Sequence, residues 1–148
     1  MEKYSYAVIG AGRQGTAAYD LARFGGVLQI LLADSHMEQA QAAAARINNL
    51  AGEEIASAAQ VDASDEQAVA DLLRPCDVVV CAVPCAFIPA CTRAVIASRT
   101  GMVDLGGHTP TVLAQLELCD QARAAGIAVV PDCGMGPGLN NSIGVYLI

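Results

Sequence analysis

The clearest chemical pattern lies near the N-terminus, where residues 10–15 read G-A-G-R-Q-G and have the spacing G-x-G-x-x-G. The motif follows the apolar run 6–9 and precedes a segment with helical spacing, a context that makes it specific for dinucleotides. Gly10 permits a tight turn, Gly12 lets the backbone approach a pyrophosphate, and Gly15 lets helix and strand pack closely. The helix N-terminus then offers free N–H groups to the anion. The predicted dinucleotide-binding residues of this segment are Gly10, Gly12, Arg13, Gln14 and Gly15.

Two carboxylates follow the next strands. Asp34 lies roughly 20 residues beyond the glycines, where it can accept hydrogen bonds from the ribose hydroxyls and repel a 2′-phosphate. Ser35 and His36 supply no arginine for that phosphate, so we predict NAD rather than NADP as the cofactor. Asp34 has an alternative interpretation as the N-cap of the following helix. Asp62 can reach the adenine or remain a solvated loop carboxylate.

Further candidate residues close the fourth and fifth strands, at the same edge of the predicted sheet. Beside the expected nicotinamide ring we place Ala82, Val83, Pro84, Asp104 and Gly106. His108 is the candidate catalytic residue, as general base or polar anchor, because an imidazole titrates near neutral pH. It can equally be a loop histidine or a partner of the helix cap before Thr109-Pro110. A catalytic thiol is not expected at Cys85 or Cys133, because hydride transfer needs none.

Alternating elements position these residues. Apolar runs predict strands at 6–9, 27–33, 55–61, 77–83, 102–105 and 127–130. Helical spacing and capping signals predict helices at 13–24, 36–50, 64–73, 89–99 and 109–125. The third of these helices begins with the capping-box pattern Ser64-x-x-Gln67, and glycines at 25–26, 101 and 126 end the first, fourth and fifth. Strands that are apolar on both faces predict an α/β fold, a doubly wound parallel sheet of the Rossmann type in three layers, α/β/α.

The composition excludes several classes of protein. The 148 residues are 54% hydrophobic and 4% aromatic, which is too apolar for intrinsic disorder. A net charge of −7 with 8 Lys and Arg residues makes a nucleic-acid surface unexpected, and no apolar run is long enough to span a membrane. The six cysteines form no Cys-x-x-Cys pair, so we predict no metal site, reduced thiols and a cytoplasmic location.

Four segments together resemble the saccharopine dehydrogenase superfamily, and most closely lysine 6-dehydrogenase. They are Val8-Ile9-Gly10-Ala11-Gly12, residues 77–80 (D-V-V-V), residues 103–108 (V-D-L-G-G-H), and residues 125–138, in which A-G-I-A-V-V-P-D-C-G leads to Pro137-Gly138. The resemblance implies NAD(P)-dependent oxidation of an amino-acid amine at its C–N bond. It also implies that most catalytic groups lie in a second domain, and we expect a homodimer at full length.

We therefore expect residues 1–133 to form the dinucleotide-binding domain, and residues 134–148 the hinge and first helix of a substrate domain. The chain would then be the N-terminal part of a longer enzyme and inactive on its own. Two alternatives remain open. One is a non-catalytic NAD-binding module, and the other is a carboxynorspermidine-type synthase that uses the same domain in the reductive direction.

Overall fold

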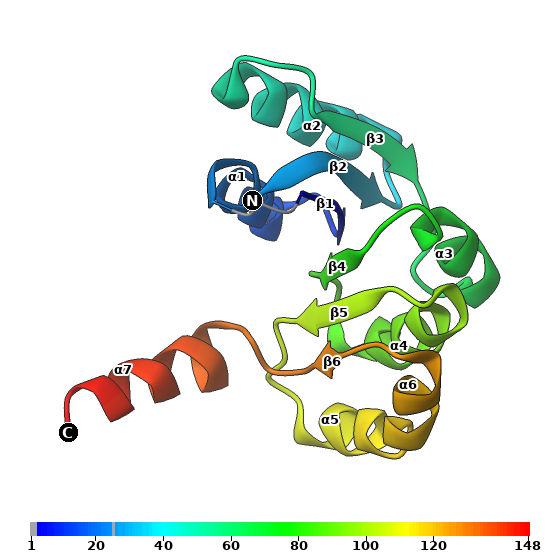
Figure 1. The fold of residues 1–148 in the computed structure, drawn as a ribbon, viewed down its shortest axis with the longest axis vertical. Helices are drawn as coiled ribbons and strands as arrows, with labels where there is room; N and C mark the ends of the chain where they lie inside the picture. The colour runs from blue at the N-terminus through cyan, green and yellow to red at the C-terminus, as the bar shows by residue number, and fades with distance from the viewer. Residues whose placement is uncertain (1–2, 25) are drawn as a thin grey trace.

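The computed structural model describes residues 3–24 and 26–148, without the side chain of Gln14. The described residues form one six-stranded parallel sheet (Figure 1). Its strands are β1 (Tyr4–Ile9), β2 (Val27–Asp34), β3 (Ala56–Gln60), β4 (Val78–Cys81), β5 (Gly101–Asp104) and β6 (Val129–Val130). The order β3-β2-β1-β4-β5-β6 reverses direction between β1 and β4. This confirms the predicted doubly wound sheet, in which ligands bind beyond the carboxyl ends of the strands at the reversal point.

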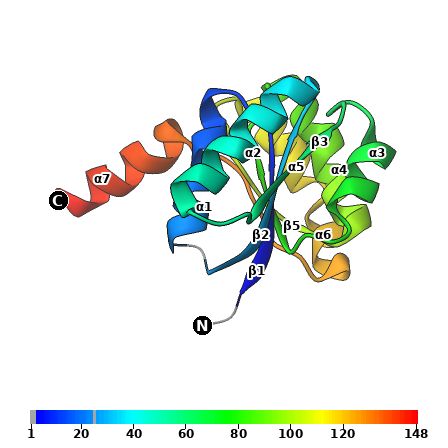
Figure 2. The same ribbon diagram turned by 90° about the horizontal axis from the view of Figure 1, so that it is seen from above.

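Helices cover both faces of the sheet. They are η1 (Arg13–Thr16), α1 (Ala17–Phe24), α2 (Met37–Ala51), α3 (Glu66–Leu73), η2 (Cys85–Phe87), α4 (Ile88–Ser98), α5 (Thr109–Leu116), α6 (Cys119–Ala125), η3 (Met135–Leu139) and α7 (Asn140–Tyr146). Figure 2 shows α1 and α2 on one face and α3 to α6 on the other, while α7 projects away from the three layers. None of the described helices has the length and apolar character needed to span a membrane.

The sheet is buried on both faces because its strands are apolar at every position near the centre. Val8 packs with Ile30 and Leu32 under α1 and α2, whereas Ile9 and Val79 face α3 and α4. Small residues such as alanine let the helices approach closely. Burying a valine, isoleucine or leucine side chain, such as Val8, Ile30 or Leu32, stabilises the fold by roughly 1.5–3 kcal/mol.

Two predicted helix ends are wrong in detail. The N-cap of α3 is Asp65, whose carboxylate accepts the amide of Ala68, rather than Ser64 of the expected capping box. Ser64 instead donates its hydroxyl to Asp62 at 2.7 Å. Helix α4 ends at Arg99, which adopts the left-handed conformation at φ 60°, so Gly101 is free to begin β5. The left-handed conformation is uncommon for residues other than glycine, so the residue type at position 99 did not predict it.

The prediction of a single helix over 109–125 is also wrong. The segment forms two helices, α5 and α6, separated at Glu117 and Leu118. The amide of Leu118 bonds to the carbonyl of Gln115, three residues back, at 3.0 Å. This tightens the last turn of α5 and redirects the chain. The other predictions of a helix that ends at a glycine are confirmed, because Gly26 and Gly126 have positive φ. Gly25 lies outside the described residues.

Candidate cofactor-binding site

The glycine-rich loop leaves β1 at the reversal point of the sheet. Gly10 has φ 99°, and a Cβ there would lie 2.5 Å from the carbonyl oxygen of Ala82 at the end of β4. A side chain at this position is therefore excluded. A Cβ at Gly12, in contrast, would meet no protein atom within 4 Å, so this stretch of backbone is open to a ligand. Gly15 is buried, and its Cβ position lies 3.9 Å from the Gly10 carbonyl oxygen.

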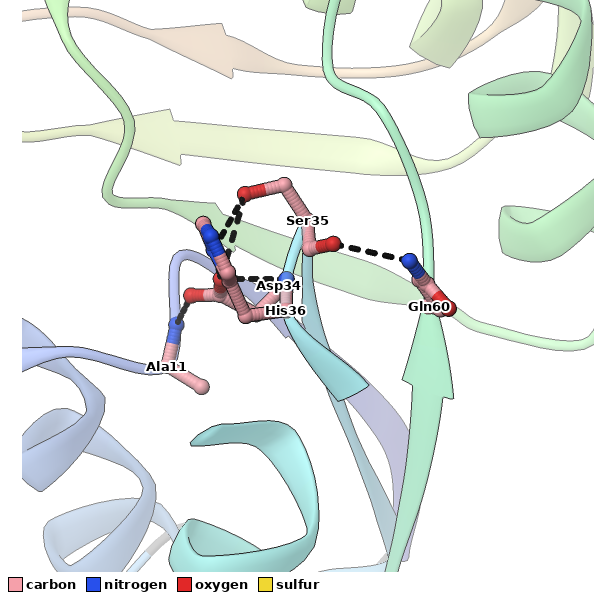
Figure 3. A network of polar contacts seen from close by, with 5 residues as sticks. All are labelled: Ala11, Asp34, Ser35, His36 and Gln60. Carbon is pink, nitrogen blue, oxygen red and sulfur yellow. Dashed lines mark hydrogen bonds and ion pairs between the residues drawn. The ribbon is translucent and has the colours of Figure 1, made fainter. Parts of the chain in front are cut away.

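Asp34 ends β2 beside this loop, as Figure 3 shows. One carboxylate oxygen accepts the amide of Ala11 at 2.9 Å, and the other accepts the amide of His36 at 3.0 Å. Burial alone would raise the pKa of Asp34, but the hydrogen bonds from His36, Ala11 and Ser35 outweigh it and hold the pKa below its ordinary value. Asp34 is thus ionised at neutral pH. The N-cap residue of α2 is His36, so the alternative interpretation of Asp34 as the N-cap is wrong.

A cavity of about 270 Å³ joins the loop to Asp34. It is lined by Ile9, Gly10, Gly12, Arg13, Asp34, Ser35, Val61, Asp62, Ala63, Ala82, Val83, Pro84 and Phe87. We call it the first cavity. Asp62 is exposed on its rim, and hydrogen bonds from the hydroxyl and amide of Ser64 lower its pKa. Seven predicted cofactor residues besides Asp34 therefore meet around one space, and Val61 and Phe87 are lining residues that sequence reasoning missed.

A second cavity of about 290 Å³ lies beyond β4 and β5. Its lining comprises Ala82, Val83, Pro84, Cys85, Ile88, Asp104, Leu105, Gly106, His108, Thr111, Val112 and Gln115. The two cavities share the segment 82–84. The structure therefore divides the predicted residues into two groups that meet at the end of β4.

His108 is exposed at the N-cap position of α5. Its Nδ1 lies 2.8 Å from the hydroxyl of Thr111, so the ring is oriented by a hydrogen bond and can present Nε2 to a ligand. Thr111 was not predicted as a site residue. The spacing His-x-x-Thr at the start of a helix is the signal that would have found it, because residues three apart share a helix face.

Residues 6–130 match the family described as the saccharopine dehydrogenase NADP binding domain. The chain belongs to this family. It is 25% identical to saccharopine dehydrogenase (L-Glu forming) from Saccharomyces cerevisiae, with a TM-score of 0.78 over 97% of this chain and 30% of that one. Quinate dehydrogenase from Corynebacterium glutamicum, in complex with NAD, is 24% identical with a TM-score of 0.60 over 89% of this chain and 45% of that one.

GenD2 from gentamicin A biosynthesis, also in complex with NAD, is 21% identical, with a TM-score of 0.66 over 88% of this chain and 34% of that one. This likeness concerns the fold. The chain spans less than half the length of each of these three structures. It is an NAD(P)-binding domain of the saccharopine dehydrogenase type, and a dehydrogenase domain of this kind serves oxidoreductases.

Within this NAD(P)-binding domain, Asp104 differs from the other predicted residues. The residue is 1% exposed, and its two carboxylate oxygens accept the side-chain amide of Gln115 at 2.8 Å and the backbone amide of Asp132 at 3.1 Å. Both oxygens of the Asp104 carboxylate are therefore occupied by hydrogen bonds within the protein, although the residue lines the second cavity. Gln115, which was not predicted, also bonds to Thr92, and its Oε1 has no hydrogen-bond partner among the described residues.

The remaining predicted residues differ in how far the structure describes them. Arg13 is exposed at the start of η1 and lines the first cavity. Gln14 lies in the same turn, but its side chain is outside the described part of the chain.

Cys85 lines the second cavity. Burial, followed by the charges of Asp104 and Asp132, raises the pKa of Cys133, so this thiol stays protonated and is a poor nucleophile.

Proposed function

We propose that this chain is the cofactor domain of an NAD-dependent dehydrogenase that oxidises an amino-acid amine, of the saccharopine or lysine 6-dehydrogenase type. The observation that carries the proposal is the pair of cavities that share residues 82–84 at the end of β4. A dinucleotide laid across this point would have its adenosine half beside Asp34 and its nicotinamide half beside Gly106 and His108. Ligands bound by open α/β sheets occupy this crevice.

When bound, the nicotinamide supplies the acceptor for a hydride. The protein's own residues bind and orient the reactants. His108, held by Thr111, faces the second cavity as the acceptor of a proton from the substrate ammonium or as its polar anchor. Loss of hydride from the carbon that bears the deprotonated amine leaves an iminium ion, which water converts to a carbonyl group and ammonium or a protonated amine. Residues 1–133 belong to the cofactor domain, and 134–148 start the substrate domain as a hinge and helix.

The cofactor preference follows from Asp34. Its ionised carboxylate would accept hydrogen bonds from the ribose hydroxyls and repel the 2′-phosphate of NADP. Ser35, which lines the first cavity, and His36, which follows it in the chain, carry no fixed positive charge to offset this repulsion. Calorimetric titration of the chain is expected to give a dissociation constant for NAD about tenfold or more below that for NADP. Tighter binding of NADP would contradict the preference, and binding of neither nucleotide would contradict the site itself.

The substrate class is tested on the protein that carries this domain. Formation of NADH with L-lysine or saccharopine at alkaline pH is expected. No turnover with lysine, saccharopine or a carboxylated polyamine would leave the non-catalytic module as the better interpretation. That second function is favoured by one observation: His108 is the single candidate catalytic group that the second cavity offers within the described residues. The exposed apolar residues of α7, Ile143 and Val145, would pack against the rest of the substrate domain that this helix begins. We further propose that the full-length enzyme is a homodimer.

A further inference from the structure

Two loops cross at the edge of the second cavity. One begins at Asp104, the last residue of β5, and runs to Gly107, and the other follows β6 (residues 131–134). The amides of Asp132 and Cys133 donate to the carboxylate and carbonyl oxygens of Asp104, at 3.1 Å and 2.8 Å. In return, the amide of Gly107 donates to the carboxylate of Asp132 at 2.9 Å. We call these three reciprocal hydrogen bonds the crossing lock.

Close backbone contact accompanies the lock. A Cβ at Gly106 would lie 1.7 Å from the Asp132 carboxylate, and one at Gly134 would lie 2.2 Å from the carbonyl oxygen of Leu105. Neither position accepts a side chain without separating the loops. Asp132 itself has φ 61°, a left-handed conformation that is uncommon for residues other than glycine and persists only where the surroundings determine it. The crossing is therefore a defined arrangement held by several independent contacts.

The lock fixes one wall of the second cavity. Gly106 and His108 line that cavity, and Gly107, between them, is the residue whose amide the Asp132 carboxylate holds. Asp132 does not itself line either cavity. It also stands at the start of the segment that leads through η3 to α7. A side chain so placed can set the position of the cavity wall without contacting a ligand.

We propose that Asp132 is a positioning residue, which holds Gly106 and His108 against the nicotinamide end of the cofactor through the Gly107 amide. The inference rests on the proposed function, because it requires the nicotinamide to occupy the second cavity. It predicts that the lock contributes to binding of the nicotinamide half and not of the adenosine half. An ordinary turn-capping role for Asp132 would make no such distinction between the two halves.

The test compares NAD with ADP-ribose, which lacks the nicotinamide, by calorimetric titration of the 148-residue chain. Asp132→Gly removes the acceptor for the Gly107 amide while glycine still accepts the positive φ. We expect the affinity for NAD to fall about tenfold, the loss of one charge-assisted hydrogen bond, and the affinity for ADP-ribose to stay within about twofold. Amide exchange at Gly107 should accelerate. Asp132→Asn keeps an acceptor oxygen and tolerates the same φ, so it should restore most of the NAD affinity.

Arg99→Gly is the matched control. Arg99 is the other described non-glycine residue with positive φ, 60°, and it lies at the opposite end of β5, so this variant should bind both ligands as the wild type does. Equal losses for NAD and ADP-ribose in Asp132→Gly, unchanged NAD affinity, or equal wild-type affinities for the two ligands would each overturn the proposal. Wild-type binding of neither ligand would instead overturn the proposed function on which it rests.

Discussion

Asp34 and Asp104 occupy matching positions on the two halves of the sheet. Each is the last residue of its strand, β2 or β5. Each also accepts a backbone amide from a loop that leaves a neighbouring strand: Ala11 after β1 for Asp34, and Asp132 after β6 for Asp104. Each carboxylate therefore links the end of its own strand to the loop after a neighbouring strand, at the carboxyl edge of the sheet. By sequence position alone, both were predicted to contact the cofactor.

Their surroundings separate them. The side chain of Asp34 keeps 12% of its surface exposed and lines the first cavity together with the exposed residues Ser35 and Arg13. Asp104 is 1% exposed, and a buried amide from Gln115 occupies its second oxygen. A carboxylate that ends a strand can serve as a ligand group only while an oxygen remains accessible. Where both oxygens are enclosed, the same residue type becomes part of the scaffold.

Removal of Asp104 should have the largest effect, and it should act on stability. In Asp104→Ala, the buried side-chain amide of Gln115 and the half-buried backbone amide of Asp132 each lose an acceptor, and each hydrogen-bond donor left unsatisfied costs about 1–3 kcal/mol. Urea denaturation is expected to show the free energy of unfolding reduced by about 3 kcal/mol. Asp104→Asn is the milder control, because the Gln115 amide can turn and accept from it through Oε1. An alanine variant as stable as the wild type but unable to bind NAD would reverse the roles assigned to the two carboxylates.

Substitution of Asp34 should produce the opposite pattern. Asp34→Asn removes the negative charge and one acceptor oxygen from the first cavity, so NAD affinity should fall about tenfold while NADP affinity holds or rises. The free energy of unfolding should fall by about 1 kcal/mol or less. Calorimetry with both nucleotides, together with urea denaturation, measures the two effects. Asp120→Asn is the control, since this exposed carboxylate pairs with Arg123 on α6. Equal losses for NAD and NADP would show that Asp34 does not select between them.

The sequence was sufficient to predict the fold because each apolar strand is bounded by glycine, proline or aspartate. It also predicted eight of the thirteen residues that line the first cavity, since the glycine motif and Asp34 are short-range signals whose spacing is set by the strands. It did not anticipate the break in helix 109–125, because neither glycine nor proline marks Glu117 and Leu118. Arg99 in the left-handed conformation was equally unmarked.

The different roles of Asp34 and Asp104 could not be predicted from the sequence, for another reason. It depends on which amides lie opposite each carboxylate, and those amides are distant in the sequence. Gln115 lies on another helix, and Asp132 follows another strand. Burial and hydrogen-bond partners at such separations arise from the packed structure. The sequence indicates that a carboxylate lies at the site edge, and only the geometry indicates whether its oxygens are free.

Acidification is expected to have the smallest effect on the free energy of unfolding. It tests whether the protein favours the charged form of Asp34. Because its pKa is lowered from 3.8 by the amides of His36 and Ala11 against the effect of burial, ionised Asp34 stabilises the fold above pH 3.8. That stabilisation is lost as the pH falls through the lower, folded-state pKa. Hydrogen bonds also lower the pKa values of Asp62, Glu66 and Asp71, so the informative quantity is the difference between the wild type and Asp34→Asn. In urea denaturation, this difference should shrink as the pH falls below 3.8, by less than about 1 kcal/mol. Stability curves that remain parallel would mean that the hydrogen bonds to Asp34 do not favour its charged form.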